Sequence, residues 1–283
     1  MQAPNFETIL VPVDFSEISG HALRTASMLA ARCGQPKIIA VHASWFEAPP
    51  YFTAGRMNAL QREFRESLQL AEESLAAFAR STLGDGGSAV QARAMEAFPA
   101  DGIRQMAALK KADLIVMGTH GRTGLNRWML GSVAERVLHE SPVPVMTVRS
   151  APPRQIGRVL GPVDDSELSR HALSYAAGLA ACLGADLTVL NVHERTGSKP
   201  VSDLCSWVPS GARARCTIRE LLRHGNAAEE IVRLASEQPY ELIVLGAARR
   251  RFFEGMVLGT TTMRTVHHAP CPVLTVGISS EQE

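Results

Sequence analysis

One stretch of the chain combines residue types and spacing that could bind a phosphate group. Gly118 and Gly121 follow the apolar run Leu114–Met117, and nine residues later the chain continues with Gly131 and Ser132. A strand that leads through a glycine loop into the start of a helix presents main-chain N–H groups, and such groups bind anions. The spacing therefore predicts a phosphate-binding loop.

Several side chains around this loop could contact a ligand. Asp14 ends the first apolar run and can accept hydrogen bonds from a base or a hydroxyl group. Gly118 has no Cβ, and a Cβ at this position would keep a ribose or phosphate away from the backbone. We expect Gly121 to occupy a turn with positive φ. The Ser132 hydroxyl can cap the helix or donate to an anion, and Arg122 can neutralise phosphate charge.

The second half of the chain repeats this pattern with one change. Gly246 follows an apolar run, and Gly259 and Thr260 come at the same spacing, but Arg249 stands where the second glycine would be. Asp164 again ends the first apolar run of its half. A tandem duplication explains this self-similarity, with one intact and one altered copy of the phosphate loop.

The two copies also predict the domain organisation. A short proline-containing polar stretch, 149–154, suits a linker and divides the chain into domains 1–150 and 155–283. Short apolar runs alternate with helical periods throughout, which is typical of a doubly wound α/β domain with a parallel sheet. In the first copy we expect five strands, at 8–13, 37–42, 89–94, 113–118 and 143–148.

The second copy is shorter because it lacks a counterpart of the long helix that the period over Met57–Phe78 predicts. The stretch from Arg195 to Arg215 has no comparable period and is interpreted as an irregular covering segment. A missing helix exposes apolar sheet surface. Either that segment or a second chain could cover it.

Composition excludes several classes of protein. A net charge of +1 gives no electrostatic reason to expect nucleic acid, and no apolar run is long enough to span a membrane. The early Asp14 is not typical of a signal peptide. Five cysteines without a closely spaced pair indicate neither a zinc ribbon nor a disulfide framework, so Cys33 and Cys182 are interpreted as buried apolar residues in a reducing, cytoplasmic setting.

Together, the glycine pattern, the strand-final aspartate and the ending Ser141–Val145 resemble the universal stress protein family over essentially the whole chain. The resemblance implies an adenine nucleotide alpha hydrolase-like fold, ATP binding in some members and pairing through the last strand. By resemblance, the first-copy nucleotide site comprises Asp14, Val41, Met117, Gly118, Gly121, Arg122, Gly131, Ser132 and Val133. The weaker second-copy set comprises Asp164, Val192, Gly246, Gly259 and Thr260, and the alignment of the copies pairs Val192 with Val41.

Three interpretations of the function follow. The first is a cytoplasmic ATP-binding stress-response or regulatory protein, with Mg²⁺ inferred from triphosphate chemistry and with neither catalytic residues nor a protein metal site. The others are a structural module that binds no nucleotide and a weak ATPase. We expect the two copies to pair within one chain, leave a further homodimer open, and expect no nucleic-acid or membrane partner.

The second copy has two interpretations of its own. Either Arg249 has disabled its loop, because a turn that needs glycine disfavours other residues, or the run Arg249–Arg251 reaches phosphates directly.

Overall fold

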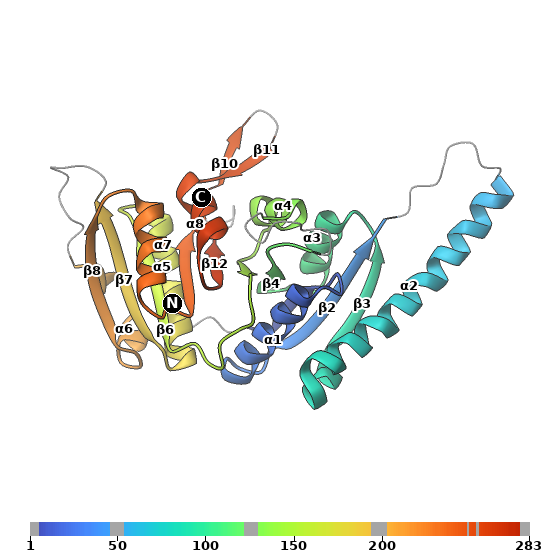
Figure 1. The fold of residues 1–283 in the computed structure, drawn as a ribbon, viewed down its shortest axis with the longest axis horizontal. Coiled ribbons are helices and arrows are strands. Elements are labelled where there is room, and N and C mark those ends of the chain that lie inside the picture. Colours follow the sequence, from blue (N-terminus) through green and yellow to red (C-terminus); the bar gives the residue numbers. More distant parts are fainter. Residues whose placement is uncertain are drawn as a thin grey trace.

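The computed structural model describes residues 6–45, 54–121, 130–193, 203–247, 249–252 and 255–277. Within these ranges strands and helices alternate along both halves of the chain (Figure 1). The predicted α/β class is confirmed. Arg122, which was predicted to contact phosphate, lies outside the described residues.

In the N-terminal half, five strands lie within three residues of the predicted bounds. The strands are β1 (Thr8–Pro12), β2 (Lys37–Ser44), β3 (Gln91–Glu96), β4 (Leu114–Gly118) and β5 (Val145–Val148). The helices are α1 (Glu17–Arg32), α2 (Ala54–Leu83), the 3-10 helix η1 (Gly84–Ala89), α3 (Pro99–Leu109) and α4 (Ser132–Glu140).

The C-terminal half repeats this order with two differences, one in place of the long helix and one after the fourth strand. Its strands are β6 (Arg158–Val163), β7 (Asp186–His193), β8 (Ile218–His224), β9 (Leu242–Gly246) and β12 (Val273–Val276), with the hairpin β10 (Arg249–Phe252) and β11 (Gly255–Leu258). Its helices are α5 (Glu167–Leu183), the 3-10 helix η2 (Leu204–Trp207), α6 (Ser210–Arg213), α7 (Ala227–Glu237) and α8 (Thr260–His268).

The two halves share one ten-stranded sheet, in the order β3-β2-β1-β4-β5-β12-β9-β6-β7-β8. Pairing is parallel within each half and antiparallel where β5 meets β12, with Leu274 opposite Met146. Hydroxyl groups reinforce this joint, since Thr147 Oγ1 donates to the Val273 carbonyl and Thr275 Oγ1 to the Val145 carbonyl. The expectation that the last strands of the two copies lie side by side is confirmed.

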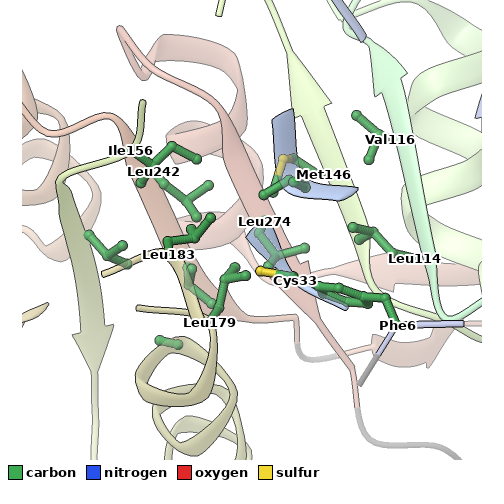
Figure 2. Packing of buried hydrophobic residues seen from close by; sticks show 14 of the residues in the cluster. Phe6, Cys33, Leu114, Val116, Met146, Ile156, Leu179, Leu183, Leu242 and Leu274 are labelled. Atoms are coloured by element: carbon green, nitrogen blue, oxygen red, sulfur yellow. The ribbon is translucent and has the colours of Figure 1, made fainter. Parts of the chain in front are cut away.

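Helices cover both faces of the sheet, because its strands are apolar on both sides. One apolar core lies between the sheet and α1, α2 and α5, and Figure 2 shows that it contains side chains from both halves. The other lies between the sheet and α3, α4, α7 and α8. Residues of the two copies occur in each core, so burial joins the halves on both faces of the sheet.

Serine side chains fix where α1 and α5 begin. The Ser16 hydroxyl accepts a hydrogen bond from Ser19 N, and Ser166 accepts one from Ser169 N. These caps satisfy donors that the first helical turn leaves without partners. The first turn of each helix is thereby held beside the aspartate that ends the preceding strand.

The long helix has no counterpart in the second half. Helix α2 has 30 residues, roughly 45 Å at 1.5 Å per residue, and extends past the sheet (Figure 1). In the second half η2 and α6 occupy this stretch, and they bury Leu204, Val208 and Ala212 in the core against α5. The prediction of a covering segment is confirmed for its described part.

The interpretation of Cys33 and Cys182 as unpaired buried residues is wrong, because the structure joins them in a disulfide. Their 149-residue separation hid the pairing from spacing rules that look for neighbouring cysteines. Cysteines 205, 216 and 271 are free thiols. Across the described ranges, none of the helices has the length and apolar character needed to cross a membrane.

Candidate functional site

A cavity of about 360 Å³ opens at the carboxyl ends of β1, β2 and β4. The strand order reverses between β1 and β4, and ligands of doubly wound sheets bind at such a switch point. Eight of the nine residues predicted for the first-copy site line this cavity: Asp14, Val41, Met117, Gly118, Gly121, Gly131, Ser132 and Val133. The ninth, Arg122, is the one outside the described residues.

Asp14 is held in place by the residues that follow it. Its Oδ1 accepts hydrogen bonds from Ser16 N (3.1 Å) and Ser16 Oγ (2.6 Å). Phe15, between them, has φ 64°, a conformation that costs a non-glycine residue about 1–2 kcal/mol. Its ring packs on His42 and Phe78, with centroids 5.0 and 5.7 Å away. Packing against β2 and α2 thus supports the strained turn that presents Asp14 to the cavity.

Gly121 is needed for a different reason from the one predicted. Its φ is not positive; the glycines with positive φ in the described residues are Gly34, Gly84, Gly184 and Gly225. A Cβ at Gly121 would instead lie 2.4 Å from Asp14 Oδ2. Any side chain here would displace the carboxylate, so the absence of a Cβ lets the loop lie over Asp14.

Gly118 also has a structural role that the sequence did not predict. A Cβ there would lie 2.7 Å from Ile18 Cγ2 of α1. At the matching place in the second half, a Cβ at Gly246 would lie 2.7 Å from Leu168 Cγ of α5. Both glycines therefore let a helix pack closely on the end of a strand, whether or not a ligand approaches.

The two ends of the glycine loop meet at the start of α4. Gly131 N donates to the Thr119 carbonyl (2.7 Å), and Thr119 N donates to the Val148 carbonyl (3.0 Å). Gly131 is the N-cap residue and has no side chain to cap the helix, and Ser132 is the first helical residue. The N–H groups of this first turn, with the positive end of the helix dipole, form an anion-binding position at the cavity wall.

The apolar wall of the cavity comes from β2, α3 and β4. Val41 and Met117 lie on it, as predicted, together with Pro99 and Ile103, which the sequence reasoning missed. It missed them because they belong to a helix that reaches the site only through the fold. An apolar wall together with a helix start suits a ligand that has an apolar base and a phosphate group.

His42 is another lining residue that sequence reasoning missed. Its Nδ1 donates to the Val13 carbonyl at 2.8 Å, while Val13 N donates to the Val41 carbonyl at 2.8 Å. These bonds fix the ends of β1 and β2 relative to each other. The sequence signal that could have identified it is a histidine directly after the apolar run 38–41 of β2.

The second half has a larger cavity, of about 790 Å³, at the corresponding strand ends. All five residues of the weaker set line it: Asp164, Val192, Gly246, Gly259 and Thr260. The strand register nevertheless corrects the pairing of Val192 with Val41, because Leu190 lies opposite Pro162 as Val41 lies opposite Pro12. Asn191 then matches His42, and its Nδ2 donates to the Val163 carbonyl (3.0 Å).

Asp164 is held by the residues that follow it, as Asp14 is, but it is exposed. Its Oδ1 accepts from Ser166 N (3.0 Å) and from the hydroxyls of Ser166 and Ser169, the latter at 2.6 Å. Burial acts to raise the pKa of Asp164, but these hydrogen bonds outweigh it and leave the pKa below its ordinary value. The carboxylate is ionised and its hydrogen bonds come from its own turn.

The loop that follows β9 differs from its counterpart. Arg249 begins β10, and the β10–β11 hairpin projects beyond the strand ends (Figure 1). A Cβ at Gly259 would meet no atom within 4 Å, whereas one at Gly131 would lie 3.5 Å from the Thr119 oxygen. Because Gly121 has no positive φ, backbone strain at Arg249 is not what separates the copies. The described residues differ in their contacts, since Gly121 lies against Asp14 whereas Arg249 begins a strand of the hairpin.

The described part of the chain contains no group of three or more His, Cys, Asp and Glu side chains placed to hold a metal ion.

Comparison with known proteins agrees with this architecture. The sequence profile of the Universal stress protein family matches residues 5–149 and again residues 155–277. A universal stress protein of Mycolicibacterium smegmatis is 29% identical over 292 residues, covering 95% of this chain and 96% of the relative. One from Methanocaldococcus jannaschii is 34% identical over 146 residues, or 51% of this chain and 82% of the relative.

A solved structure has the same fold along its whole length. The universal stress protein from Archaeoglobus fulgidus DSM 4304 superposes with a TM-score of 0.70 at 22% identity, covering 96% of this chain and 98% of that one. One family profile thus matches each half of the ten-stranded sheet in turn. The chain is a tandem member of the universal stress protein family.

Proposed function

We propose that the N-terminal half binds ATP and that the chain acts as a nucleotide-dependent stress-response or regulatory protein. The observation that carries this proposal is that eight residues from three separate parts of the sequence line one cavity at the switch point of the sheet. Chance placement of glycines in turns would not bring these particular residues together.

The proposal assigns roles from the chemistry of the cavity wall. The adenine lies against Val41 and Met117, the ribose near Asp14 and Gly118, and the phosphates at the α4 start with Gly121, Gly131, Ser132 and Val133. His120, whose Nδ1 lies 3.0 Å from Thr119 Oγ1, is a further side chain at the phosphate end. Backbone N–H groups supply the main anion contacts, so binding needs few charged side chains.

Mg²⁺ is proposed as a companion of the triphosphate, which would supply phosphate oxygens that this cation prefers. No catalytic residue is proposed, and hydrolysis is limited to slow turnover of positioned phosphates. Because ATP is an intracellular nucleotide, the proposed site implies a cytoplasmic protein.

We also propose that residues 1–150 and 155–283 form two domains, with the nucleotide in the first. The exposure of Asp164, and the larger cavity beside it, support a second domain that does not hold nucleotide in the same manner.

The test is to purify the protein without added nucleotide, denature it and identify the released small molecules by chromatography and mass. We expect an adenine nucleotide at about one per chain, and titration calorimetry with Mg-ATP on the stripped protein should give the same stoichiometry. If no nucleotide is released and calorimetry shows no binding at millimolar ATP, the chain is a structural module. Release of phosphate from bound ATP would identify the weak ATPase.

A further inference from the structure

Two helices that begin at the two cavities are joined to each other at their opposite ends. Cys33 is the C-cap residue of α1, and Cys182 is the last residue but one of α5. Their Cα atoms are 5.6 Å apart, within the range of roughly 4.4–6.8 Å that a disulfide spans. The bond links the two halves across 149 residues of chain.

The two sulfur atoms differ in their surroundings. Cys33 is buried, at 3% exposure, and Figure 2 shows it among apolar side chains of both halves, including Phe6 and Leu179. Cys182 is half-buried, and its Sγ lies 3.5 Å from the Arg32 carbonyl at an exposed position. A thiol reagent therefore reaches the bond through Cys182.

We propose that Cys33 and Cys182 form a reversible thiol-oxidation site that opens and closes a covalent link between the two halves. The link is closed by a hydroperoxide or a small-molecule disulfide and opened by a dithiol reductant. The free thiols at 205, 216 and 271 take no part in it.

The chemistry balances as a two-electron exchange. On closing, the two thiols lose two protons and two electrons to form the S–S bond, and one hydrogen peroxide is reduced to two water molecules. On opening, a thiolate of the dithiol attacks Cys182 Sγ and Cys33 leaves, taking up a proton to become a thiol. The second thiol of the reductant then resolves the mixed disulfide, so that Cys182 becomes a thiol and the reductant a disulfide.

The position of the link gives it a structural consequence. Helix α1 runs from Ser16, beside Asp14, to Cys33, and α5 runs from Ser166, beside Asp164, to the turn that contains Cys182. Without the link, the halves remain joined by the β5–β12 pairing and the linker. Oxidation thus ties the far ends of the two helices together without moving either cavity residue directly.

The experiment uses the full chain with a protease recognition sequence inserted between Arg154 and Gln155, both exposed in the linker. Reduced protein is treated with hydrogen peroxide or oxidised glutathione, alkylated, cleaved and analysed on a denaturing gel without reductant. We expect one species near the uncleaved 30.5 kDa, which separates into two fragments on reduction. The alkylated cysteines should fall from the five in the sequence to the three free thiols.

Variants assign the bond. Cys33→Ser, or Cys182→Ala at the more exposed partner if the first variant does not fold, should give separate fragments under every condition, and Cys271→Ser should behave like the parent. The proposal is overturned if all five cysteines are alkylated after oxidation or if peptide masses show a different pair. It is also overturned if a dithiol reductant leaves the bond intact in the folded protein, since the link would then be a permanent brace.

Discussion

The two halves of the sheet have the same strand-final aspartate and the same helix start, yet they enclose different cavities. In the first half Gly121 lies against Asp14, and Gly131 N donates to the Thr119 carbonyl, so the two described ends of the glycine loop meet beside α4. In the second half the corresponding loop forms the β10–β11 hairpin, and Asp164 stays exposed. The comparison teaches that the residues after the fourth strand of each half, and not the strands themselves, account for the difference between the two cavities.

Gly121→Ala is the variant that tests the difference between the two halves most directly. The new Cβ would lie 2.4 Å from Asp14 Oδ2, so the flexible carboxylate must rotate away from its bonds to Ser16 while the fold survives. We expect the affinity for ATP to fall at least ~10-fold, a loss of about 1.4 kcal/mol or more. Titration calorimetry measures this loss, and Gly259→Ala, where a Cβ meets open space, is the matched control. Unchanged affinity in Gly121→Ala would remove this glycine from the site.

A second pair of changes separates packing from binding. Gly118→Ala and Gly246→Ala each place a Cβ 2.7 Å from the side chain of a packed helix. Overpacking of this kind costs about 1–3 kcal/mol in the free energy of unfolding, and we expect both variants to show it in urea denaturation. Only Gly118→Ala should also weaken ATP binding. Equal effects on binding would mean that both cavities hold nucleotide.

We expect the free energy of unfolding to depend on pH because of His21, in the N-terminal half. Burial, with a smaller contribution from Arg24, lowers the pKa of His21 below its ordinary value. A lowered pKa means that the unfolded chain takes up this proton first, so the contribution is complete above about pH 6.5 and is lost as the pH falls through the folded pKa. Urea denaturation from pH 7.5 to 5 should show a shallower loss of stability in His21→Gln than in the parent. The control is His171→Gln, at the more exposed matching position; an identical change in both variants would contradict the assignment.

The smallest effect is expected from Arg249→Gly. This variant restores the glycine pattern in the second half, but Arg249 lies in a β-strand of a projecting hairpin. Replacing one residue leaves the pairing of β10 with β11 in place, because main-chain hydrogen bonds form it. We therefore expect calorimetric stoichiometry to stay near one ATP per chain. A rise towards two would show that the arginine alone had blocked the second cavity.

The spacing of apolar residues, and the turn-forming residues between the apolar segments, predicted most of the fold. Apolar runs located the strands of the first half, and the repeated spacing identified two copies. These features depend on local sequence, where the pattern of burial and the hydrogen-bonding capacity of each residue leave few alternatives. Asp14 and Gly118 were likewise placed by strand ends, which parallel topology brings together, whereas Val41, Met117 and Val133 came from the family resemblance.

The errors concern contacts between residues far apart in sequence. Val192 was paired with Val41, although the register assigns Leu190, because a two-residue offset within an apolar strand leaves the pattern almost unchanged. The disulfide between Cys33 and Cys182 depends on how α1 and α5 pack across the two halves. Local spacing carries no information about either contact.

The amino-acid sequence by itself determined a duplicated α/β chain with an intact glycine loop in its first copy, because the residues that form strands, helix starts and loops are specified locally. Only the tertiary structure decided why those glycines are required. Gly121 must leave room for Asp14, and Gly118 for Ile18, and a Cβ clash exists only once the fold has brought the two residues together. It also decided that a disulfide joins the halves, since that bond depends on how α1 and α5 pack against each other.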